Sequence, residues 1–175
     1  MKITHAVHFA FDLSLAQREA VAFVQDAQQS LSKASFIRNL EVSQVGTTTG
    51  EQRVKASIPI NAALFGQHDL SFESVLMPNA RGARLEPRTP NTPKMGWAEV
   101  AGDAEVRPLP SGSHVKYHFD ITIHLDLPQP EKWGGQALTK MIHFTAQRVL
   151  EGVAAEFPRA VQEAAAETEA AYSNA

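Results

Sequence analysis

A helical repeat of apolar residues runs through the C-terminal stretch GQALTKMIHFTAQRVLEGVAAEFPRAV (residues 135–161). Its inward positions recur every three or four residues, which keeps them on one side of a helix: Leu138, Met141, Ile142, Thr145, Val149, Val153, Phe157 and Val161. The opposite side is polar. We therefore expect one long amphipathic helix, kinked or broken at Pro158, with an alanine- and glutamate-rich tail that frays from about residue 164.

The chain before this helix alternates at a period of two, which is typical of β-strands with one buried face. Strands are predicted at residues 3–11, 40–45, 53–60, 69–77, 83–88, 97–107 and 114–127. A helix is predicted over residues 15–31, and serines near its end favour a split into two shorter helices. The predicted order is strand, helix or helix pair, five or six strands and a long helix. This order indicates an α+β class and a single domain over residues 1–175.

Composition excludes several classes of function. The chain has no cysteine, so disulfides, thiolate catalysis and cysteine-bound metals are ruled out. Its net charge is −3 and it has no run of lysine or arginine, so we expect no nucleic-acid partner. No apolar stretch reaches the roughly 20 residues that span a bilayer, and the first residues do not form a signal peptide. We therefore expect a soluble, cytoplasmic protein.

The order of elements resembles the helix-grip fold of START domains, Bet v 1 pollen allergens and polyketide cyclase-like proteins. Two hairpins carry the resemblance, through GWAEV (residues 96–100) with GSHVKY (residues 112–117), and RVKA (residues 53–56) with LSFE (residues 70–73). They look like hairpins of the bacterial members that are related to the G component of carbon monoxide dehydrogenase. The resemblance implies a seven-stranded sheet wrapped around the C-terminal helix, with an apolar cavity between them. It does not select a function, because its members include lipid carriers, hormone receptors, cyclases and chaperone activators.

The leading hypothesis is a module that binds or carries a hydrophobic small molecule or a lipid. The predicted lining combines inward positions of the strands and of the long helix: Val7, Phe9, Phe72, Ser74, Leu85, Trp97, Tyr117, Phe119, Leu138, Met141, Ile142 and Thr145. The hydroxyls of Ser74 and Thr145 either orient the ligand or bond to the backbone. Trp97 is either a packing anchor or a gate. No phosphate-binding loop or nucleophile elbow occurs, so no cofactor is predicted.

Two histidines and two aspartates alternate on one face of the last strand: His118, Asp120, His124 and Asp126. Alternate residues of a strand stand about 6.6 Å apart, so His118 and Asp120 could share a metal with a neighbour. The opposite face of this strand is uniformly apolar, so we interpret the polar face as solvated and predict no metal site.

Two alternative functions stay open. The first is a cyclase- or dehydratase-type enzyme, for which His5 and Tyr117 are the only predicted inward acid or base residues. The second is an interaction or assembly module with a collapsed cavity. Its contact with a protein or a membrane would be the apolar loop tip at Ala63, Leu64 and Phe65.

Overall fold

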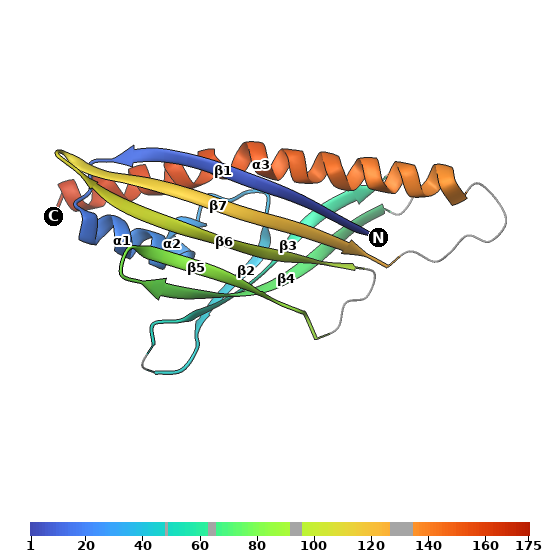
Figure 1. Ribbon diagram of the computed structural model, residues 1–175, viewed down its shortest axis with the longest axis horizontal. Helices are drawn as coiled ribbons and strands as arrows, with labels where there is room; N and C mark the ends of the chain where they lie inside the picture. The colour runs from blue at the N-terminus through green and yellow to red at the C-terminus, as the bar shows by residue number, and fades with distance from the viewer. Residues whose placement is uncertain (48, 63–65, 92–95, 127–134) are drawn as a thin grey trace.

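The computed structural model describes residues 1–47, 49–62, 66–91, 96–126 and 135–175. Its elements follow the predicted order (Figure 1): β1 (Lys2–Leu13), α1 (Gln17–Gln25), α2 (Ala27–Ser30), β2 (Arg38–Gln44), β3 (Gln52–Ala62), β4 (Gly66–Asn79), β5 (Gly82–Arg88), β6 (Gly96–Leu109), β7 (Gly112–Leu125) and α3 (Gly135–Ser173). None of the described helices is long and apolar enough to cross a bilayer.

The seven strands form one antiparallel sheet in the order β1-β7-β6-β5-β4-β3-β2. The predicted alternation sets which side chains face inward. In β7, Tyr117, Phe119, Ile121 and Ile123 are all buried, as predicted from their spacing. Their side chains join residues of the other strands, α1 and α3 in one hydrophobic cluster. The sheet with its single long C-terminal helix confirms the predicted helix-grip fold.

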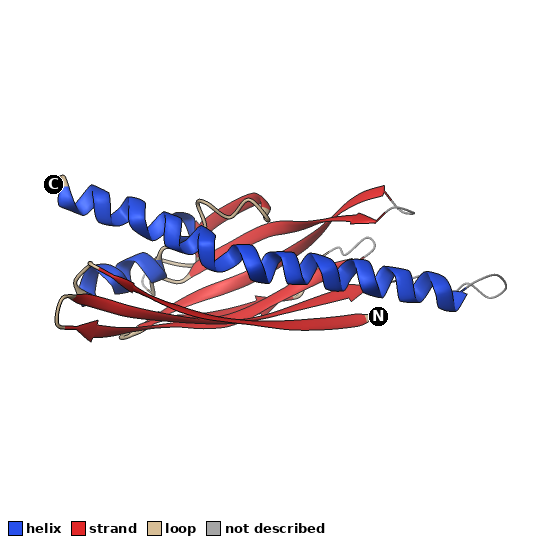
Figure 2. Ribbon diagram, turned by 90° about the horizontal axis from the view of Figure 1, so that it is seen from above, coloured by secondary structure: helices blue, strands red, loops and turns tan. Residues whose placement is uncertain are grey.

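Helix α3 lies along the sheet and contacts both β1 and β3, so it bridges strands near the two edges (Figures 1 and 2). It continues through Pro158 without a break and ends at Ser173. The tail that we expected to fray is therefore helical in the structure. Its small residues Ala164 and Ala165 are buried, and the Thr168 hydroxyl accepts a hydrogen bond of 2.9 Å from the side-chain amide of Gln29.

The predicted split of the first helix occurs at Asp26. The carboxylate of Asp26 accepts a hydrogen bond of 3.0 Å from the backbone amide of Gln29 and so caps α2. At the end of α1, the side-chain amide of Gln25 donates two hydrogen bonds of 2.8 Å, to the carbonyls of Asn79 and Gly82. These bonds fix the helix pair to the turn between β4 and β5, at one end of the sheet (Figure 1).

The sheet is incompletely paired at its centre. The register of β5 on β6 runs only from Gly82 to Leu85, after which β5 pairs with β4 alone among the described residues. The carbonyl of Val100 lies on β6 just beyond this ladder. It accepts a hydrogen bond of 2.8 Å from the hydroxyl of Ser74, which is fully buried on β4. One side-chain hydrogen bond therefore holds β4 close to β6 where the backbone ladder stops.

Candidate ligand-binding cavity

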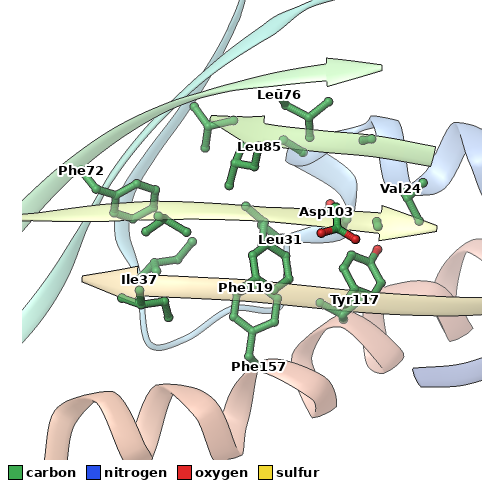
Figure 3. Close-up of a pocket in the computed structure, with 18 of the residues that line it drawn as sticks. Val24, Leu31, Ile37, Phe72, Leu76, Leu85, Asp103, Tyr117, Phe119 and Phe157 are labelled. Carbon is green, nitrogen blue, oxygen red and sulfur yellow. The ribbon is translucent and has the colours of Figure 1, made fainter. Parts of the chain in front are cut away.

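A cavity lies between the sheet, the α1–α2 end of the molecule and the second half of α3 (Figure 3). About 70 Å³ of it is open to the centre of a water-sized molecule. The helices and the segment before β2 contribute Val24, Ala27, Ser30, Leu31, Phe36 and Ile37. The sheet contributes Val54, Ile58, Phe72, Leu76, Ala83, Arg84, Leu85, Val100, Asp103, Ala104, Tyr117, Phe119 and Ile121, and α3 contributes Val153, Phe157 and Val161.

Aromatic rings form one side of the cavity. The ring of Phe157 on α3 lies 4.5 Å from that of Phe119 and 5.3 Å from that of Phe36, measured between centroids. The ring of Tyr117 stacks on Phe9 at 5.0 Å and on Phe119 at 5.7 Å. Such ring pairs add about 0.5–1.5 kcal/mol each to the burial of their area. This side of the cavity is therefore held together by helix and sheet side chains in mutual contact.

Four of the predicted lining residues lie in the cavity wall: Phe72, Leu85, Tyr117 and Phe119. The predicted helix positions do not. Met141 is 43% exposed, Leu138 and Thr145 are half-buried, and Ile142 is buried away from the cavity. The helix lines the cavity about 15 residues later, which is roughly 22 Å farther along its axis. The helical period identified the buried face of α3 but not the part of that face that meets a void.

The other predicted lining residues lie around the cavity or away from it. Val7 is buried on β1 outside the wall, and Phe9 packs behind Tyr117 rather than facing the void. The hydroxyl of Ser74 bonds to the backbone, as does that of Thr145, which donates to the carbonyl of Met141 at 3.0 Å. Neither hydroxyl is thus free to orient a ligand.

Trp97 is also outside the cavity. Its neighbour in sequence, Ala98, is fully buried on the inner face of β6, so Trp97 lies on the outer face of the sheet. There its ring stacks on His124, with centroids 4.5 Å apart and planes at 5°. His124 in turn places Nε2 3.0 Å from a carboxylate oxygen of Glu99. Trp97 therefore acts as a packing anchor of the outer face.

Sequence reasoning missed the segment between α2 and β2, which closes the cavity from one end. Its apolar residues Leu31, Phe36 and Ile37 all line the void. The signal was present, because a short connection between a helix and a strand is normally polar. Gly102 of β6 was also missed. A Cβ atom there would come within 2.6 Å of the Phe119 ring, so the glycine makes room for this wall residue.

Few polar groups reach the cavity. Arg84 and Asp103 face each other across the β5–β6 ladder, and their side chains are 68% and 61% exposed. Both therefore lie on the outer face of the sheet, next to the buried Ala83 and Ala104, and they reach the cavity only at its rim. Ser30 is buried in the wall, and Tyr117 is buried with its hydroxyl among apolar side chains. Burial raises the pKa of the Tyr117 hydroxyl well above its ordinary value. His5 is half-buried on β1 and does not line the cavity.

The polar residues of β7 form an outer cluster. His118 lies 3.5 Å from the carboxylates of both Asp103 and Asp120, and its ring stacks on His8 with centroids 4.3 Å apart. Within the described parts of the chain, no group of three or more histidine, aspartate and glutamate side chains could hold a metal. The loop tip at residues 63–65, for which we predicted a partner contact, lies outside the described residues.

Solved structures share this fold at low sequence identity. The aromatase/cyclase Zhui from Streptomyces sp. R1128 matches with a TM-score of 0.55 at 12% identity, over 93% of this chain and 94% of that chain. The two-domain aromatase/cyclase StfQ of the steffimycin biosynthetic pathway matches with a TM-score of 0.55 at 14% identity, over 94% of this chain and 52% of that chain. The protein of unknown function SA2116 from Staphylococcus aureus matches with a TM-score of 0.50 at 7% identity, over 99% of this chain and 98% of that chain.

These likenesses show the fold, which is the helix-grip fold predicted from the sequence. At such identities they say nothing of ligand or reaction. No curated protein sequence matches this chain. One family of sequences matches residues 8–155, from the middle of β1 to the middle of α3. On that match, the chain belongs to the family described as "Protein of unknown function (DUF3809)".

Proposed function

We propose that this protein binds a small, largely apolar molecule in the cavity between the sheet, the α1–α2 end and the second half of α3. The observation that carries the proposal is a void beside the hydrophobic core whose described wall is almost entirely apolar. Protein interiors are normally close-packed, so an apolar void of this size is a candidate site for an apolar molecule. The apolar wall is poorly suited to water, which needs two to four polar partners.

The size of the void narrows the class of ligand. One water needs roughly 10–15 Å³ of space measured at the centre of the molecule, and the cavity offers about 70 Å³. Sites for drug-sized ligands run to about 300–1,000 Å³. The cavity therefore suits a small molecule in this conformation. A long lipid chain or an extended polyketide would require α3 or the α1–α2 pair to move outward.

Binding rather than catalysis is favoured by the wall. A cyclase or dehydratase needs an acid or base positioned at the reacting atoms. The charged wall residues Arg84 and Asp103 direct most of their side-chain surface to solvent, and His5 is not in the wall. Tyr117 is the remaining inward acid, and burial raises the pKa of its hydroxyl, which makes it a weaker proton donor. The closer likeness to proteins related to the G component of carbon monoxide dehydrogenase stays a prediction, as does the cytoplasmic location.

A matched pair of variants on α3 tests the position of the site. Val153→Phe fills the cavity from its helix wall. Leu138→Phe is the control, because it adds a similar ring to the same helix outside the wall, at a residue that the sequence analysis predicts to line the site. The probe is α-methylstyrene, a neutral apolar molecule, added at up to millimolar concentration and followed through the methyl resonances of the protein.

We expect saturable shifts of cavity methyl groups in the wild type and in Leu138→Phe, and none in Val153→Phe. Circular dichroism checks that both variants are folded. The proposal is wrong if the wild type shows no saturable shift, or if Val153→Phe binds as well as the wild type. Loss of binding in Leu138→Phe alone would place the site along the first turns of α3 instead.

A further inference from the structure

One polar atom in the cavity has nothing to bond to. Tyr117 is only 4% exposed, and its hydroxyl has no hydrogen-bond partner among the described residues. It comes from β7 and lines the cavity (Figure 3). Buried hydroxyls are normally hydrogen-bonded, because an unpaired one keeps the full penalty of leaving water.

The ring of Tyr117 cannot turn to bring its hydroxyl to solvent without breaking several contacts. It stacks on Phe9 at 5.0 Å, on Phe119 at 5.7 Å and on Phe11 at 6.2 Å. These three neighbours are themselves part of the cavity wall or the layer behind it. The hydroxyl is therefore held at a fixed place on the wall of an apolar void.

A water molecule is a poor partner for this hydroxyl. Buried waters make about three hydrogen bonds. Apart from Tyr117, the described wall offers only Ser30 and the two rim residues Arg84 and Asp103 as polar side chains. The side chain of Arg84 is mostly exposed and lies 3.6 Å from the carboxylate of Glu86. A ligand that carries its own acceptor atom would satisfy the hydroxyl and bury its carbon atoms in the same event.

We propose that the Tyr117 hydroxyl donates a hydrogen bond to an oxygen acceptor on a neutral, otherwise apolar ligand, such as a ketone, an aldehyde or an ester. This inference rests on the proposed function and names the ligand class for the same cavity. The phenol is suited to donate because it keeps its proton at neutral pH and carries an O–H donor at a fixed place on the wall. A carboxylate is excluded from this class, because Arg84 is the one cationic wall residue among those described, and its charge stands at the rim.

Three probes of similar shape separate the contributions. Acetophenone carries a carbonyl oxygen where α-methylstyrene carries a methylene group, and benzoate carries a carboxylate. Each is titrated into the wild type, Tyr117→Phe and Tyr172→Phe. Tyr117→Phe removes only the hydroxyl and keeps the ring. Tyr172→Phe makes the same change at the only other tyrosine, which is exposed near the end of α3.

We expect Tyr117→Phe to weaken acetophenone roughly tenfold, as for one net hydrogen bond, and to change α-methylstyrene by less than about twofold. Tyr172→Phe should change neither. In the wild type, benzoate should bind at least about tenfold more weakly than acetophenone at neutral pH. The infrared carbonyl band of bound acetophenone should lie at lower frequency in the wild type than in Tyr117→Phe, because a donated hydrogen bond weakens the C=O bond.

The inference is overturned, and the proposed function kept, if α-methylstyrene binds and Tyr117→Phe leaves both the affinity and the carbonyl band of acetophenone unchanged. It is also overturned if benzoate binds as tightly as acetophenone. If none of the probes binds the wild type, the proposed function itself fails.

Discussion

Replacing Tyr117 by phenylalanine should make the ligand-free protein more stable. The hydroxyl is buried and unpaired, so in the folded state it has lost its bonds to water and gained none among the described residues. A buried polar group without a hydrogen bond reduces the free energy of unfolding by about 1–3 kcal/mol. Removal of the oxygen leaves a cavity of roughly 10 Å³, which reduces the free energy of unfolding by about 0.2 kcal/mol at 24 cal/mol per Å³. The ring stacks on Phe9 and Phe119 remain, so we expect a net gain of about 1 kcal/mol.

The assay is urea unfolding at neutral pH, followed by circular dichroism for the wild type, Tyr117→Phe and Tyr172→Phe. The midpoint of Tyr117→Phe should rise with an unchanged slope, and its melting temperature should increase by about 2–4 °C. Tyr172→Phe, at an exposed site, should stay within about 0.5 kcal/mol of the wild type. A loss of 1 kcal/mol or more in Tyr117→Phe would refute the reasoning, since it would mean that the hydroxyl has a partner in the free protein.

The same variant should change the response to alkali. In the unfolded chain the pKa of a tyrosine is about 10, and in the folded protein burial raises the pKa of Tyr117 above that value. Below about pH 10 the hydroxyl keeps its proton in both the folded and the unfolded protein, so it does not make the free energy of unfolding depend on pH. Above it the unfolded chain loses the proton first, so the wild type should lose about 1.4 kcal/mol of stability per pH unit relative to Tyr117→Phe. Parallel curves above pH 10 would contradict a raised pKa.

Two further changes test how the sheet supports the cavity. Ser74→Ala leaves the buried carbonyl of Val100 without its hydrogen bond and should reduce the free energy of unfolding by about 1–3 kcal/mol. The exposed Ser71→Ala on the same strand serves as its control in urea unfolding. Gly102→Ala would press its Cβ against the backbone oxygen of His118 and bring it within 2.6 Å of the Phe119 ring, and it should cost about 1–3 kcal/mol. Gly152→Ala meets nothing within 4 Å on α3 and should instead stabilise by about 0.5–1 kcal/mol. Equal effects of the two glycine changes would show that the space at Gly102 is not needed.

The fold could be predicted because its strands and its long helix differ in period. The alternation through Tyr117, Phe119 and Ile121 assigns β7 and its inner face without any tertiary information. The tail of α3 was harder to predict. Ala164 and Ala165 have side chains too small to mark a buried face in the sequence. In the structure both are buried, and α2 reaches this part of the helix through the hydrogen bond between Gln29 and Thr168.

The position of the cavity could not be predicted in the same way. The period of a helix predicts which of its faces is buried. A void depends instead on where the side chains of several elements, distant in sequence, pack incompletely against one another. Ile142 and Val153 are both buried on the same face of α3, and only Val153 faces the void. The segment with Leu31 and Phe36 lines the same void, and the ring of Phe36 packs against Phe157 of α3. That segment precedes α3 by about 100 residues in the sequence.

The α1–α2 end also explains how a ligand could be admitted without opening the whole core. Helix α1 is tied to the β4–β5 turn through Gln25, and α2 is tied to the tail of α3 through Gln29 and Thr168. The first tie is two side-chain hydrogen bonds and the second is one, each with a net value of about 0.5–1.5 kcal/mol. By contrast, the opposite wall is a continuous backbone ladder from β6 to β1, with each strand paired along nearly its whole length. Ala20, Phe23 and Val24 of α1 are also buried in the core, so separating the helix pair would cost their burial as well as these hydrogen bonds. A ligand admitted at this end would meet the Tyr117 hydroxyl on the continuously paired wall opposite.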